Sequence, residues 1–186
     1  MRSDAFETEE CDYSAVQLET ADLILKKAVF EDWEPLYRNI TGRAESAKYM
    51  LWKPDESEEA AKARMLRTIE FEKKEKYAFL VYLKSSMEPI GFAAMREAEP
   101  GIFEEMGIAV GPEYVRHGYG KQIVNAFCKE AFVQGATEFR ASYRVKNHPC
   151  EKMLESCGFS FDYDSEEKTD PHTGETYIVR NVKKML

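Results

Sequence analysis

The sequence predicts a single domain with a mixed α/β fold, in which helices flank a mostly antiparallel central sheet. Short runs of β-branched and aromatic residues alternate with longer segments whose apolar residues recur at helical spacing. Several of the short runs follow one another across turns, as antiparallel neighbours do. With 186 residues, the chain has the length of one domain and can bury a sizeable core.

The N-terminal part is expected to hold a polar arm, a strand and a helix. Residues 1–17 predict an arm that is disordered or packs on a partner, so that the domain itself spans residues 18–186. The apolar run at 23–25 predicts the first strand. Residues 30–40 predict a helix, with Pro35 near its first turn.

A second helix and a hairpin follow after a connection at 41–54. Large apolar side chains in this connection are expected as ordinary core, and the alternative is that they line a substrate pocket. The helix is predicted at 55–75, with Asp55 and Glu58 as a capping pair. Strands are expected at 77–83 and 89–96. The residues of the connection that raise this question are Tyr49, Met50, Leu51 and Trp52.

The stretch 104–133 organises the rest of the chain. A strand at 104–110 leads into a loop that holds Gly118 and Gly120, and a helix follows with apolar residues at helical spacing. Gly135 is a plausible stop for this helix. The pattern therefore places a glycine loop between a strand and a helix start.

Such a loop predicts an anion-binding cradle. The first N–H groups of a helix have no partner inside the helix, and glycine lets the backbone approach a phosphate closely. Arg116, His117 and Lys121 add positive side chains, in a chain whose formal net charge is −8. The alternative is a purely structural strand–helix turn.

A strand, a helix and two closing strands complete the predicted sheet. Alternating residues predict a strand at 138–145, and Pro149 predicts the start of a helix that ends at Gly158. His148 is expected as the N-cap of this helix, which leaves the side chain of Asn147 free. The closing strands are expected at 159–163 and 177–182, on either side of a polar loop at 164–175.

Composition argues against several classes of protein. The acidic balance opposes nonspecific nucleic-acid binding and suits a cationic substrate such as an amine. No apolar run approaches the ~20 residues that span a bilayer, and the N-terminus lacks an apolar signal core, so a cytoplasmic protein is expected. No two cysteines have zinc-site spacing, and Cys128, Cys150 and Cys157 are expected as small core residues.

Two motifs, together with the strand near the N-terminus, resemble the GNAT N-acyltransferase superfamily. The segment Val115-Arg-His-Gly-Tyr-Gly120 falls on the family's Q/R-x-x-G-x-G/A loop. Asn147, Cys150 and Gly158-Phe159 fall on its second signature, N-x-x-S/A ending in G-F. The likeness covers about residues 18–183 and is greatest to the branch that includes the ribosomal-protein N-terminal acetyltransferases.

The resemblance implies an acyl-CoA N-acyltransferase fold, in which the fourth and fifth strands, at 104–110 and 138–145, splay apart around acetyl-CoA. It implies direct transfer of an acetyl group to a primary amine, either a protein N-terminus or a small amine, by a monomer or homodimer. The residues that it implies in acetyl-CoA binding are Ile108, Ala109, Val110, Val115, Arg116, His117, Gly118, Tyr119, Gly120, Lys121, Asn147 and Cys150.

Glu105 is the first candidate for the general base, and Glu104 is the second. On a regular strand Glu105 shares a face with Gly107 and Ala109, whose small size leaves room for a substrate. A bulge in this strand would exchange the faces, which keeps Glu104 in consideration. The alternative for either residue is a surface or ion-paired carboxylate.

The sequence departs from the family pattern at two positions. Val115 stands where the family has Gln or Arg, and Leu154 stands where many members have the tyrosine that protonates the departing thiolate. Leucine has no proton to donate, so the donor is unassigned. A non-catalytic acyl-CoA-binding module is therefore the alternative to an enzyme. A nucleotide-binding protein fits less well, because neither GxxxxGK[ST] nor GxGxxG is present.

Overall fold

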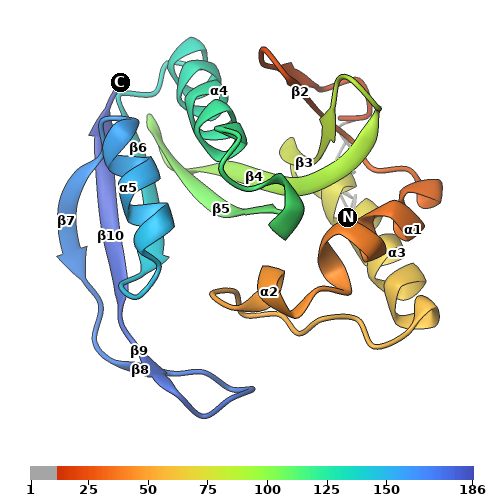
Figure 1. Cartoon of the computed structure of the whole chain (residues 1–186). Helices are drawn as coiled ribbons and strands as arrows, with labels where there is room; N and C mark the ends of the chain where they lie inside the picture. Colours follow the sequence, from red (N-terminus) through yellow and green to blue (C-terminus); the bar gives the residue numbers. More distant parts are fainter. Residues whose placement is uncertain (1–11) are drawn as a thin grey trace, which may run out of the picture.

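The structure is a computed structural model that describes residues 12–186. An eight-stranded sheet forms its centre, in the order β1-β2-β3-β4-β5-β6-β10-β7 (Figure 1). All neighbouring strands are antiparallel except β5 and β6, which confirms the predicted mixed, mostly antiparallel sheet. Residues 1–11 of the expected polar arm lie outside the described residues.

The elements follow the predicted order, with some additions. The strands of the sheet are β1 (Leu18–Glu19), β2 (Leu23–Lys26), β3 (Tyr77–Leu83), β4 (Glu88–Glu99), β5 (Ile102–Val110), β6 (Glu138–Arg144), β7 (Ser160–Asp164) and β10 (Val179–Met185). The helices are η1 (Phe30–Asp32), α1 (Trp33–Leu36), η2 (Tyr37–Thr41), α2 (Ala44–Ala47), α3 (Glu58–Lys74), η3 (Pro112–Tyr114), α4 (Tyr119–Val133) and α5 (His148–Ser156). A separate hairpin consists of β8 (Lys168–Thr169) and β9 (Thr176–Tyr177).

The sheet separates two apolar cores, and β3 contributes to both. Phe79 and Val81 belong to the larger core, which α4 and α5 cover. Leu80 and Tyr82 belong to the smaller core, beneath α1 and α3. Because successive side chains of a strand point to opposite faces, a strand buried on both sides is a continuous apolar run, as residues 77–83 are.

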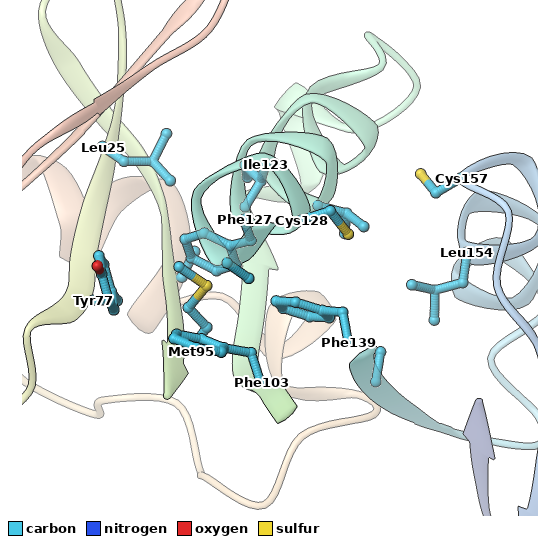
Figure 2. Close-up of a cluster of buried hydrophobic side chains, with 14 of the residues drawn as sticks. Leu25, Tyr77, Met95, Phe103, Ile123, Phe127, Cys128, Phe139, Leu154 and Cys157 are labelled. Carbon is cyan, nitrogen blue, oxygen red and sulfur yellow. The ribbon is translucent and has the colours of Figure 1, made fainter. Parts of the chain in front are cut away.

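The larger core joins α4 and α5 to the sheet. In Figure 2, Phe127 of α4 lies over Met95 and Phe103, while Leu154 and Cys157 extend from α5 toward the same cluster. Cys128 and Cys157 are buried here and Cys150 packs against this core, which confirms the prediction of small core residues for the three cysteines.

The strands β5 and β6 lie together at one end and separate toward the other (Figure 1). Their parallel pairing comprises Ile102 with Glu138, Phe103 with Phe139 and Glu104 with Arg140. Beyond Glu104, β5 pairs with β4 alone, and β6 pairs with β10 alone. The predicted splay between the fourth and fifth long strands is therefore confirmed.

A β-bulge at Met106 corrects the predicted faces of β5. Gly107 lies opposite Ala94 and Glu105 lies opposite Met95, so Met106 has no partner on β4. One extra residue exchanges the faces that follow it. Glu105 consequently shares the face of α4 with Ile108 and Val110, rather than a face with Gly107 and Ala109.

Two predicted helix caps are wrong. The second long helix begins at Glu58, and the hydroxyl of Ser57 accepts from the N–H of Ala60 at 3.2 Å. Asp55, expected as the cap, instead accepts from Nε of Arg64 at 2.8 Å. In α5 the cap is Asn147, not His148: Oδ1 of Asn147 accepts from the N–H of Cys150 at 3.3 Å.

Three segments are more ordered or less regular than expected. The helix predicted at 30–40 is a succession of 3₁₀, α and π turns around Pro35, which has no N–H to donate to a regular helix. The polar loop predicted at 164–175 contains part of the β8–β9 hairpin, and the connection at 41–54 contains α2.

Candidate active site

The N-terminus of α4 provides unpaired backbone donors. Gly118 caps the helix with φ of 79°, a conformation that favours glycine, and nothing lies within 4 Å of where its Cβ would be. The first helical hydrogen bond runs from the N–H of Gln122 to the carbonyl of Gly118 at 3.0 Å. The N–H groups of Tyr119, Gly120 and Lys121 therefore have no partner within the helix.

A cavity of about 960 Å³ extends from this helix end into the space between β5 and β6. Its walls come from both strands, the start of α4, α5 and the segment 49–52. Most of the predicted site residues line it: Glu105, Ile108, Val110, Val115, Arg116, Gly118, Tyr119, Gly120, Lys121, Asn147 and Cys150. Segments far apart in the sequence thus meet at one site.

Three predicted residues do not line this cavity within the described part of the chain. Glu104 pairs with Nη2 of Arg96 at 2.6 Å. The side chain of Ala109 is buried away from it, and the ring of His117 stacks on Tyr119 with 5.5 Å between centroids. Only the backbone of Ala109 is then available to a ligand between β5 and β6.

Glu105 lies where the two strands begin to separate. Burial, opposed by hydrogen bonds from the N–H groups of Ser142 and Gly107, raises the pKa of Glu105 to about 7. The neighbouring charge of Glu104 acts in the same direction as burial. A carboxyl group with this pKa exchanges protons near neutral pH, which suits a general base.

Cys150 lies near this carboxyl group but is not an activated nucleophile. Burial and the charge of Glu105 raise the pKa of the Cys150 thiol to about 12. The thiol is therefore protonated at neutral pH, whereas nucleophilic cysteines require the thiolate.

The segment 49–52 forms part of the wall of the cavity. Tyr49, Met50, Leu51 and Trp52 all line it, so the expectation of ordinary core holds only for Trp52, which also packs against the smaller core. The Leu51 side chain is 60% exposed. The alternative reading of this segment, a pocket wall, is the better description.

Arg144 connects this wall to the β8–β9 hairpin, which the sequence did not single out. Its Nη2 donates to the carbonyl of Met50 at 3.1 Å and pairs with Asp170 at 2.7 Å. Nε2 of His172 lies 3.0 Å from the carbonyl of Leu51. Hydrogen bonds from the N–H of His172 and from Arg144 lower the pKa of Asp170 to about 2. The hairpin and the wall are thereby held together beside the cavity.

Within residues 12–186, no helix is long and apolar enough to cross a bilayer. The same residues contain no group of three or more His, Cys, Asp or Glu side chains placed to hold a metal ion.

A splayed sheet with a helix N-terminus at the mouth of the split defines the class of acyl-CoA-dependent acyltransferases. The domain family described as "Acetyltransferase (GNAT) domain" matches residues 22–160. The chain belongs to this family and is an acetyltransferase that uses acetyl-CoA as its acyl donor. No curated protein sequence matches the chain.

Solved structures share this fold at low sequence identity. A GNAT-family acetyltransferase from Bacillus anthracis is 19% identical, with a TM-score of 0.77 over 91% of this chain and 98% of its own. An acetyltransferase from Salmonella typhimurium, which modifies the N-terminal serine of 50S ribosomal subunit protein L7/L12, is 15% identical, with a TM-score of 0.74 over 92% and 99%. The microcin C7 self-immunity acetyltransferase MccE, solved with acetyl-CoA and AMP, is 17% identical, with a TM-score of 0.74 over 90% and 94%.

Proposed function

We propose that the protein transfers the acetyl group of acetyl-CoA directly to a primary amine, with Glu105 as the general base. The observation that carries this proposal is a carboxyl group with a pKa of about 7 at the point where β5 and β6 separate. The same carboxyl group lines the cavity that begins at α4. A protein N-terminus and a small amine are both acceptors of this kind.

The split between the strands has the donors that acetyl-CoA needs. Beyond Glu104, the edge of β5 that faces β6 has no strand partner, so backbone groups among Ile108, Ala109 and Val110 are open to the pantetheine arm. The free N–H groups at the start of α4 face the pyrophosphate, with Arg116 and Lys121 beside them. Asn147 and Cys150 complete the opposite wall.

Glu105 fits the proton transfers of the reaction better than Glu104 does. An amine must lose its proton to attack, and the thioester supplies an activated carbonyl whose C–S bond breaks as the C–N bond forms. Glu105 takes the proton that the ammonium group loses before attack and releases it to solvent. A second proton leaves the nitrogen once the C–N bond has formed, and it neutralises the departing thiolate. Glu104 is ion-paired with Arg96 outside the cavity, and the protonated thiol of Cys150 favours direct attack over an acetyl-cysteine intermediate.

The test compares two neighbouring glutamates. Glu105→Gln should lower kcat by about 10²–10⁴, the usual contribution of a general base, in an acetylation assay over a panel of amines and N-terminal peptides. Glu104→Gln is the matched control and should retain nearly full activity. Calorimetric titration with acetyl-CoA should give similar affinities for both variants. Equal losses in the two variants, or no acetyl-CoA binding by the folded protein, would contradict the proposal.

Leu154 occupies the position of the usual tyrosine and is buried, and leucine has no proton for the departing thiolate. The cytoplasmic location and the monomeric or dimeric state remain predictions, which cell fractionation and light scattering would check.

A further inference from the structure

The guanidinium of Arg144 brings hydrogen-bond donors to the cavity that no residue in the described part of the chain uses. Arg144 lines the cavity, and 14% of its side chain is exposed. Both of its hydrogen bonds come from Nη2, which donates to the carbonyl of Met50 at 3.1 Å and to Oδ2 of Asp170 at 2.7 Å. Arginine has five N–H donors in a planar fork, so those of Nε and Nη1 stay free.

These two nitrogen atoms have accessible surface. Among residues 12–186, only Oγ of Ser46 and Nε1 of Trp52 are buried side-chain atoms without a hydrogen-bond partner. Nε and Nη1 of Arg144 have no partner either, so they differ from those two atoms in being accessible. Because Arg144 lines the cavity, a ligand atom there can reach its guanidinium.

The guanidinium is held in place by residues outside the cavity. Asp170 is buried, and the centroid of the Tyr177 ring lies 4.0 Å from Cζ of Arg144. Neither residue lines the cavity. A carboxylate, an aromatic face and the carbonyl of Met50 therefore fix the group before any ligand arrives, which lowers the entropy lost on binding. A fixed guanidinium with free donors beside a cavity suits the recognition of an oxygen atom.

Arg144 lies on the same strand as the backbone group that contacts Glu105. The carboxyl group of Glu105 accepts from the N–H of Ser142. Arg144 is two residues further along β6, which corresponds to roughly 7 Å of strand. An acceptor whose amine lies at Glu105 therefore reaches Arg144 with a group that is several bonds away from the amine.

The charges favour a neutral oxygen over a carboxylate. Asp170 compensates the charge of Arg144, and Glu105 adds a negative charge to the same cavity when it is ionised. A carboxylate of the acceptor would lie near both anions, and like charges that lie close together repel each other. A carbonyl oxygen accepts the same hydrogen bond without this repulsion.

We propose that Arg144 is a specificity-determining residue, which donates from Nε or Nη1 to a neutral carbonyl oxygen of the acceptor while the amine of the acceptor lies at Glu105. The acceptor is then an amino amide, either a small molecule or the first residues of a peptide. This inference rests on the proposed function, because Glu105 fixes the position of the amine.

Matched amines test the recognition of the oxygen. Glycinamide, β-alaninamide and γ-aminobutyramide place the oxygen at increasing distance from the amine, and an alkylamine of equal length lacks it. For the wild-type protein we expect kcat/KM of the best amide to exceed that of its alkylamine by about 10–100-fold, the usual worth of a hydrogen bond to a charged donor. Equal values for every amide and its alkylamine would overturn the proposal.

Two further sets of acceptors define the chemistry of the oxygen. The amino acids that correspond to the three amides have a carboxylate in place of the amide, and they should be poorer acceptors than the amides. Carboxylates that exceed the amides would overturn the choice of a neutral oxygen. Glycylglycinamide distinguishes the two sources of an amino amide, since a peptide site should prefer it to all three small amides.

Arg144→Lys locates the donor. Lysine keeps a positive charge beside Asp170, but its single nitrogen is engaged by that carboxylate and by the carbonyl of Met50. The amide-to-alkylamine ratio of kcat/KM should fall about tenfold through a higher KM for the amide. This ratio cancels differences in reactivity between the amines. Arg140→Lys is the control, since Arg140 lies on the same strand and does not line the cavity. An unchanged ratio in Arg144→Lys would overturn the proposal.

A second variant guards against loss of folding. Replacement of Arg144 alone leaves the buried carboxylate of Asp170 without its usual partner. The double substitution Arg144→Gln with Asp170→Asn removes both charges together, which leaves no buried charge uncompensated. It should lower the same ratio as Arg144→Lys does, with unchanged affinity for acetyl-CoA.

Calorimetry without turnover separates this inference from the proposed function. The protein is saturated with CoA, which has no acetyl group to transfer, and is titrated with each amide. Saturable binding that Arg144→Lys weakens, in a protein that acetylates none of the amines, would support the role of Arg144 and overturn the proposed activity. Acetylation that depends on Glu105 but not on Arg144 would overturn this inference alone.

Discussion

At the scale of single residues, we expect the raised pKa of Glu105, the proposed general base, to make catalysis depend on pH. The carboxyl group is inactive as a base while it is protonated, and its pKa is raised from 4.5 to about 7. We therefore expect kcat/KM to rise with pH and to level off above about 7. The ratio of wild-type to Glu105→Gln rates, measured with one amine from pH 5 to pH 9, isolates this group from the titration of the amine. A ratio that is constant over this range would contradict the assignment.

At the scale of elements, hydrogen bonds join the β8–β9 hairpin to the segment 49–52, which lines the cavity. The two segments come together through Arg144, Asp170 and His172, although Leu51 and His172 are 121 residues apart in the sequence. Both ends of the Arg144–Asp170 pair are nearly buried, with 14% and 6% of the side chains exposed. A buried hydrogen-bonded charge pair resists separation, because each partner alone would be left uncompensated.

Asp170→Asn tests this connection. Loss of the charge should weaken the contact between residue 170 and Arg144, which joins the hairpin to the segment 49–52. Amide hydrogen exchange should then accelerate in the hairpin and at 49–52. The KM for the acceptor should rise. Loss of a charged hydrogen bond of this kind costs roughly 1–3 kcal/mol in unfolding free energy. Asp164→Asn, which breaks a more exposed pair with Arg180, is the control. Unchanged exchange at 49–52 in Asp170→Asn would show that the two segments are independent.

At the scale of the whole molecule, stability should fall as pH rises from about 4.5 to about 7. Burial raises the pKa of Glu72 to about 7, although the N–H of Ala28 and the charge of Lys27 oppose the increase, and Asp32 adds to it. The folded state then binds more protons than the unfolded state in this interval, so the contribution is complete below 4.5 and is lost as pH passes 7. Glu105 acts in the same direction.

Glu72→Gln should remove the part of this dependence that Glu72 contributes, and the part from Glu105 should remain. An amide oxygen can still accept from the N–H of Ala28, but the side chain no longer ionises. Urea unfolding at pH 5 and pH 8 should show a difference that is smaller than in the wild type by roughly 2 kcal/mol. Glu70→Gln, an exposed residue of the same helix, should leave the difference as it is. Identical pH dependence in both variants would contradict the raised pKa.

The sequence predicts those structural features that depend on residues close together in the chain, and it does not predict contacts between distant segments. The run at 77–83 and the Gly118 loop are predicted from residue type. A strand buried on both faces is a continuous apolar run, and a positive φ favours glycine. The bulge at Met106 has no recognisable residue pattern, and it reverses the face on which each later side chain of β5 lies. Ser57 and Asp55 are both preferred N-cap residues, so residue type does not decide between them. Asn147 is a better N-cap than His148 by residue type, and that preference alone predicts the observed cap. The Arg144 contacts join distant segments and have no local signal at all.

The short pairing between β5 and β6 has a mechanical consequence. Three residue pairs hold two half-sheets together along a seam, and beyond it each half ends in an open edge. We expect a ligand that binds in the split and contacts both strands to hold the two half-sheets together. A ligand that binds only the folded state raises the melting temperature by mass action. The melting temperature should therefore rise as the split is filled by ligand.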